Sequence, residues 1–141
     1  MKKFFSTVLA VVAAMAINAD NYYIGGVNNS WPTPGSDAAY QLTGEGDVLT
    51  ASFERLATTD GLKVFVGEGW GNIEYGKPSD DAILIPNGDA VVLAQVTSGG
   101  NIGVLLAEGH YLANATVSFN PTTLELAVAG TDVDGSAEPD T

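Results

Sequence analysis

The chain has 141 residues, 17 of them acidic and 5 basic, which gives a formal net charge of −12, and it contains no cysteine. A surface this negative repels phosphate backbones and anionic lipid headgroups, so binding to nucleic acid or to a membrane surface is not expected. The lack of cysteine excludes disulfides, zinc–thiolate sites and thiol catalysis.

The first 19 residues are typical of a signal peptide. Lys2 and Lys3 precede an apolar run over residues 4–16, and small residues permit cleavage after Ala16 or Ala19. Because this run is shorter than the ~20 residues that a spanning helix needs, we expect no membrane-spanning segment. Export is predicted, to the periplasm, the cell surface or the exterior. Without a cysteine to carry a lipid anchor, we expect the exported chain to be released.

The remaining sequence predicts short strands and no helix. Strand-like runs are separated by Gly, Asn, Pro and Asp, and no long window shows a helical stripe. In chain order these runs are Tyr22–Gly26, Ala39–Thr43, Val48–Leu56, Leu62–Val66, Ala82–Ile85, Val91–Thr97, Asn101–Leu105, Tyr111–Phe119 and Leu124–Ala129.

The last two runs form the clearest pattern, a terminal hairpin around a turn at residues 120–123. One face of its first strand is expected to carry Tyr111, Ala113, Ala115, Val117 and Phe119. Seven to nine short strands without a helix predict an all-β fold, an antiparallel Ig-like β-sandwich over residues 20–130. Residues 131–141 are mostly acidic or small, and apolar residues do not recur among them at a strand or helix period, which predicts a disordered tail.

No catalytic, cofactor or metal site is predicted. His110 is the only histidine. Asp80 and Asp81, as neighbours in a strand, would point to opposite faces rather than form a glycosidase pair, whereas adjacency in a loop leaves that question open. The glycine-rich turn at residues 67–71 is not followed by the helix that a phosphate loop needs. Residues 132–135 resemble the start of a calcium loop but lack its remaining ligands.

Exposed aromatic rings in loops favour a sugar-binding function instead. Trp31 lies in a proline-flanked loop and Trp70 in a glycine-rich turn, where large rings have few packing partners. The candidate binding residues are Trp31, Lys63, Trp70, Asn72, Tyr75 and Asn101, with the rings stacking on sugar and the polar groups bonding to hydroxyls. The alternative for either indole is that it folds back onto the core, and Lys63 alternates with Leu62 and Val64 and so also fits a solvent-facing position.

The chain resembles the small β-sandwich starch-binding modules of outer-membrane proteins of the SusE/SusF type, and related modules of secreted amylases and pullulanases. The resemblance covers residues 22–128, through the pieces Tyr22–Gly26 with Trp31, Leu62–Val66 with Trp70 and Tyr75, Gly100–Ile102, and Gly109–Tyr111. It implies two aromatic platforms, Trp31 and Trp70, a hydroxyl donor, Lys63, and Tyr75 as a weaker contact. Unlike those proteins, this chain has neither an anchor cysteine nor tandem modules, so a single weakly binding module is expected.

Two functions therefore remain open at this point. The first is an exported, non-catalytic carbohydrate-binding module for polysaccharide or oligosaccharide, with α-glucan as the leading ligand. The alternative is a structural or protein-interaction β-sandwich that has lost its sugar site and pairs with a protein partner at the cell surface through a strand edge.

Overall fold

A computed structural model describes residues 21–135 of the chain. In this range the elements are β1 (Tyr22–Gly25), η1 (Val27–Asn29), η2 (Ala38–Tyr40), β2 (Gln41–Leu42), β3 (Leu49–Leu56), β4 (Lys63–Val66), β5 (Glu74–Gly76), β6 (Ile83–Leu84), β7 (Val91–Val92), β8 (Ala94–Val96), β9 (Gly103–Val104), β10 (His110–Asn120) and β11 (Glu125–Asp134). None of the helices in this range has the length and apolar character needed to span a membrane.

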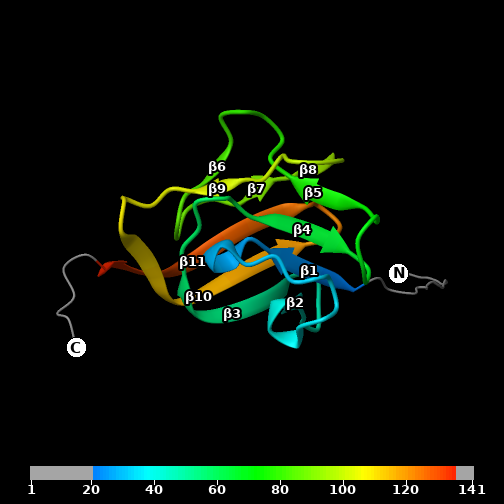
Figure 1. The fold of residues 1–141 in the computed structure, drawn as a ribbon, viewed down its shortest axis with the longest axis horizontal. Coiled ribbons are helices and arrows are strands. Elements are labelled where there is room, and N and C mark those ends of the chain that lie inside the picture. Colours follow the sequence, from blue (N-terminus) through cyan, green and yellow to red (C-terminus); the bar gives the residue numbers. More distant parts are fainter. Residues whose placement is uncertain (1–20, 136–141) are drawn as a thin grey trace, which may run out of the picture.

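The strands form two antiparallel sheets that pack face to face, which confirms the predicted all-β sandwich. One sheet has the order β2-β1-β4-β5-β8 and the other the order β3-β10-β11-β7. In Figure 1 the strands β1 and β4 cross in front of the long hairpin β10–β11. The short strands β6 and β9 form a separate parallel pair, which the prediction of a purely antiparallel fold did not include.

The core lies between the two sheets and is built from alternating strand residues. Ile24 on β1 and Val64 on β4 are fully buried from one side, and Val117 and Phe119 on β10 are fully buried from the other. Each such side chain stabilises the fold by roughly 1.5–3 kcal/mol relative to its exposed state. Because Ile24 and Val64 face this core, their strand neighbours must face the opposite side of the sheet.

The segment predicted as one strand over Val91–Thr97 divides between the two sheets at Leu93. Before this residue β7 pairs with β11, and after it β8 pairs with β5. Leu93 itself is buried, and its N–H donates to the carbonyl oxygen of Leu124. The strand β5 was not predicted, because its three residues follow a glycine-rich turn and end in glycine, with no alternation to reveal them.

A β-bulge in β10 makes the predicted inward face wrong for the first part of the strand. The pairing with β11 shifts between Ala113 and Thr116, and Asn114 takes a positive φ of 51°. As a result Leu112 is fully buried, whereas Tyr111 and Ala113 are only partly so. A single extra residue reverses the side-chain alternation, and the sequence pattern of a regular strand cannot show where it occurs.

The predicted disordered tail is also wrong in its first residues. Strand β11 continues to Asp134, because the long strand β10 provides backbone partners as far as the pair His110–Asp134. Backbone pairing thus stabilises a segment whose side chains lack apolar rhythm. The predicted signal peptide and the last residues of the predicted tail, 136–141, lie outside the described residues.

Candidate functional site

A shallow groove of about 380 Å³ lies on the side of the five-stranded sheet that faces away from the core. Its floor comes from β4, where Lys63 and Phe65 alternate with the core residue Val64. Phe65 pairs with Glu74 of β5, so the side chain of Glu74 emerges on the same side of the sheet. The residues that line the groove are Trp31, Lys63, Phe65, Trp70, Glu74, Thr97, Ser98, Gly99 and Asn101.

Three aromatic rings give the groove its shape. The ring of Trp31 stands edge-on to Phe65, with 6.3 Å between centroids and an interplanar angle of 89°. The ring of Trp70, from the glycine-rich turn after β4, also stands edge-on to Phe65, with 5.4 Å between centroids and an interplanar angle of 81°. The centroids of the two indole rings are therefore separated by no more than the sum of these distances, and both rings contact Phe65. Trp70 is 53% exposed and Trp31 is half-buried, so both offer ring surface to solvent.

The position of Trp31 is set by Gly25, against which the indole packs, and by hydrogen bonds to the segment at residues 59–60. A Cβ at Gly25 would lie 2.8 Å from Trp31 Cε3, so only glycine leaves room for the indole on the sheet. The amide oxygen of Asn29 accepts hydrogen bonds from the backbone N–H groups of Thr59 and Asp60. The indole Nε1–H in turn donates to Asp60 Oδ2 at 3.3 Å.

The Trp70 loop is connected to the Trp31 loop by the backbone. Gly69 N–H donates to the carbonyl oxygen of Pro34 at 2.9 Å, which joins the two segments directly. Asn72 donates from its amide to the carbonyl oxygen of Glu68 and closes the Trp70 turn. These bonds hold the two indoles in position before any ligand arrives, which lowers the ordering cost of binding.

The groove also contains a largely buried ion pair. Lys63 Nζ lies 2.9 Å from Glu74 Oε1, and their side chains are 8% and 16% exposed. Within the described part of the chain the Lys63 ammonium group hydrogen-bonds only to Glu74, so two of its three N–H donors have no protein partner. An unmet buried polar group costs about 1–3 kcal/mol, so these donors require water or a ligand in the groove.

Four of the six predicted binding residues come together in this groove: Trp31, Lys63, Trp70 and Asn101. The Asn101 amide donates to the carbonyl oxygen of Asp60 and so also braces the loop below Trp31. Lys63 is buried in an ion pair rather than solvent-facing, because the two loops cover its strand on the outer side of the sheet.

The other two predicted residues lie elsewhere. Tyr75 points to the core side of the sheet, where its ring packs 6.2 Å from that of Phe119. Tyr75 belongs to the strand β5, which the sequence did not predict, and its neighbour Glu74 takes the groove-facing position. The amide of Asn72 is committed to its own turn and lines an adjacent hollow with Gln95 and Thr97.

Sequence reasoning missed Phe65, Glu74 and the segment 97–99. The first two had a signal: a hairpin closed by the glycine-rich turn pairs residue 65 with residue 74 and places both beside Lys63. The segment 97–99 had none, because it reaches the groove only through the pairing of β8 with β5.

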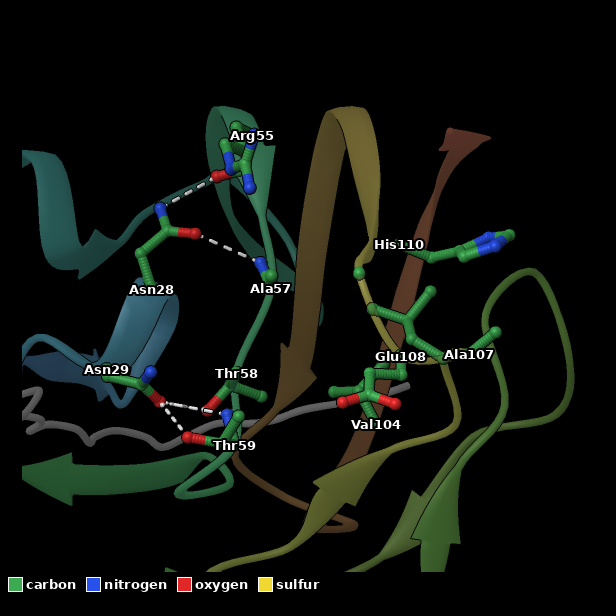
Figure 2. Close-up of a pocket in the computed structure, with 12 residues that line it drawn as sticks. Asn28, Asn29, Arg55, Ala57, Thr58, Thr59, Val104, Ala107, Glu108 and His110 are labelled. Atoms are coloured by element: carbon green, nitrogen blue, oxygen red, sulfur yellow. Dashed lines mark hydrogen bonds between the residues drawn. The ribbon is translucent and has the colours of Figure 1, made fainter. Parts of the chain in front are cut away.

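A second hollow, of about 560 Å³, lies beside Arg55 near the C-terminal end of β3 and is less suited to a ligand (Figure 2). Its two asparagines serve the fold: Asn28 bonds to the backbone of Arg55 and Ala57, and Asn29 to the segment that follows. The imidazole of His110 points away from the hollow in Figure 2 and contacts Asp132. None of the six predicted residues lines it.

His110 forms a small charged cluster with the end of β11. Its Nδ1 lies 2.6 Å from Asp132 Oδ1, and its Nε2 lies 3.8 Å from Asp134 Oδ1. The hydrogen bond to Asp132, together with the charges of both carboxylates, raises the pKa of His110 above its ordinary value of 6.5. Among the described residues no group of three or more His, Cys, Asp or Glu side chains is arranged to hold a metal ion.

Comparison with known proteins finds no matching family model, no matching curated protein and no matching solved structure. The resemblance to starch-binding modules of the SusE/SusF type therefore stays a prediction from the sequence.

Proposed function

We propose that this protein is an exported, non-catalytic carbohydrate-binding module whose ligand is α-glucan, held in the groove between Trp31 and Trp70. The single observation that carries the proposal is the pair of indoles, both partly exposed and both edge-on to Phe65. The apolar CH faces of a sugar ring stack on such surfaces. Two such rings in one groove give an oligosaccharide two stacking surfaces.

The polar groups of the groove support a neutral ligand. Lys63 and Glu74 carry opposite charges, so the pair adds no net charge to the groove floor. Thr97, Ser98 and Asn101 add uncharged polar side chains at the edge. Few directed hydrogen bonds combined with stacking give modest affinity, which suits a module that holds a polymer.

The groove also lacks the usual arrangement for glycoside hydrolysis. Retaining and inverting glycosidases usually need two carboxyl groups flanking the scissile bond. Among the described residues that line this groove, Glu74 is the one carboxylate, and it is paired with Lys63. The proposal is therefore binding without cleavage.

The test is affinity electrophoresis of residues 20–141 in native gels that contain soluble starch or glycogen. We expect retardation of the wild type, and loss of retardation for Trp70→Ala, because removal of one stacking ring weakens binding about tenfold. Leu105→Ala is the matched control, since Leu105 is 55% exposed and Trp70 53%, and Leu105 does not line the groove. Unchanged mobility of the wild type in every polysaccharide would refute the proposal and favour a protein-interaction role.

A further inference from the structure

Asn87 attaches the turn between β6 and β7 to the edge of β11. Its backbone N–H donates to the carbonyl oxygen of Val128 at 2.9 Å. Its side-chain amide donates to the carbonyl oxygen of Gly130 at 2.9 Å and accepts from the N–H of the same glycine at 3.0 Å. The Asn87 amide group therefore satisfies both backbone groups of one β11 residue, as a neighbouring strand would.

The turn itself has the sequence Ile85-Pro86-Asn87-Gly88. The N–H of Gly88 donates to the carbonyl oxygen of Ile85 at 2.9 Å, and Asn87 has a φ of 63°. This is the geometry of a type II turn, in which proline suits the second position and asparagine or glycine the third. Asn87 and Gly88 are both exposed, so water reaches the pair. No other asparagine in the chain is followed by glycine.

An asparagine that is followed by glycine can react with its own backbone. The nitrogen of Gly88 can attack the side-chain carbonyl carbon, Cγ, of Asn87, because glycine has no Cβ to obstruct the approach. A bond forms between Gly88 N and Asn87 Cγ, the Cγ–Nδ2 bond breaks, and ammonia leaves with the proton of the Gly88 amide. Water then opens the resulting succinimide ring at either carbonyl, which gives aspartate or isoaspartate at position 87.

The folded turn restrains this reaction. Both polar atoms of the Asn87 amide are bonded to Gly130, so the side chain is held at β11. The attacking nitrogen is also engaged, because the Gly88 N–H is bonded to Ile85. Attack requires that these hydrogen bonds open. The rate in the folded protein is therefore the rate in the open turn multiplied by the fraction of molecules in which the turn is open.

We propose that Asn87–Gly88 is a deamidation site controlled by opening of this turn, and that the product no longer closes the turn on β11. A carboxylate at position 87 still accepts from the N–H of Gly130 but has no hydrogen to donate to its carbonyl oxygen, which lies 2.9 Å from Asn87 Nδ2. Isoaspartate adds a carbon to the backbone of the turn as well. The modified chain loses the cover over this part of the β11 edge, and an uncovered edge can pair with another chain. This inference does not depend on the proposed carbohydrate-binding function.

The first test is peptide mapping by mass spectrometry after incubation of residues 20–141 in mildly alkaline buffer, with and without a urea concentration that unfolds the protein. We expect deamidation of Asn87 in both samples, at least about tenfold more slowly in the folded one, because the closed turn is open for only a small fraction of the time. Equal rates in the two samples, or an Asn87 that stays unconverted in the folded sample, would overturn the proposal.

Pro86→Ala shows whether turn opening controls the rate. Proline favours the closed turn by restricting the open chain, so this variant should deamidate about threefold faster than the wild type when folded and at the same rate in urea. Pro78→Ala is the matched control, because Pro78 lies in another exposed loop, and its rates should equal those of the wild type. An unchanged folded-state rate in Pro86→Ala would contradict control by the turn.

Asn87→Asp reproduces the aspartate product and tests its effect on the turn. Hydrogen exchange of the backbone N–H at position 87, corrected for intrinsic rates, should be about tenfold faster than in the wild type. Asn114→Asp is the matched control: Asn114 is also exposed, has a φ of 51°, and its side chain makes no hydrogen bond within residues 21–135. Wild-type exchange at position 87 in Asn87→Asp would overturn the proposal, because the product would then close the turn as well as asparagine does.

Discussion

Substitution of Gly25 tests whether the groove is built as described, independently of any ligand. A Cβ at this position would lie 2.8 Å from Phe65 Cε2 and 2.8 Å from Trp31 Cε3, closer than side chains pack. Both rings line the groove, and Phe65 also packs against both indoles. Gly25→Ala must therefore displace Trp31, Phe65 or the strand beneath them.

The expected cost is that of overpacking, about 1–3 kcal/mol in the free energy of unfolding. Gly103→Ala is the control, because Gly103 lies in a strand with no atom within 4 Å of its added Cβ. This control should be neutral or slightly stabilising, since alanine restricts the unfolded chain. Urea denaturation of the two variants and the wild type, followed by circular dichroism, gives the free energies.

A double-mutant cycle identifies the contact responsible. In a Trp31→Ala background one of the two close contacts disappears, so Gly25→Ala should cost less there than in the wild type. Equal stability of Gly25→Ala and Gly103→Ala would refute the reasoning, because it would mean that Trp31 does not lie on Gly25.

Two further predictions concern the loop and the histidine cluster. Asn29→Ala should destabilise the protein by about 0.5–1.5 kcal/mol in urea denaturation, because the exposed backbone N–H groups of Thr59 and Asp60 exchange their protein acceptor for water; wild-type stability would contradict this. His110→Gln should lower stability most below pH 6.5 and progressively less as the pH rises through the raised pKa of His110, because the folded state holds this proton more tightly than the unfolded state does. A stability difference between wild type and His110→Gln that grows with pH would show the opposite sign and contradict the raised pKa.

The sequence predicted the sandwich because most of its strands carry period-2 alternation between turn residues. The strands around Val64 and Val117 needed no long-range information, since each pattern already defines an inward face. The sheet switch at Leu93 and the bulge at Asn114 were not predictable in this way. Each depends on which strand pairs with the segment. In the sequence alone, both segments have the apolar pattern of an ordinary continuous strand.

The candidate site was partly predictable for a related reason. Trp31 and Trp70 stood out because each lies in a loop whose prolines or glycines leave a large ring without neighbours in sequence. Tyr75 has the same appearance, but its strand pairing turns it toward Phe119. Glu74 looks like any surface carboxylate until that pairing brings it to Lys63. Loop composition reveals candidate rings, and only strand register decides which side of the sheet each side chain takes.

The central claim is that one ligand contacts both tryptophans at once. The chain has two tryptophans, so the indole N–H region of an NMR spectrum should contain one signal from each, assigned by Trp31→Phe. On titration with maltoheptaose we predict that both signals shift and that both curves give the same Kd. A shift of only one indole signal, or of neither at saturating sugar, would contradict the account.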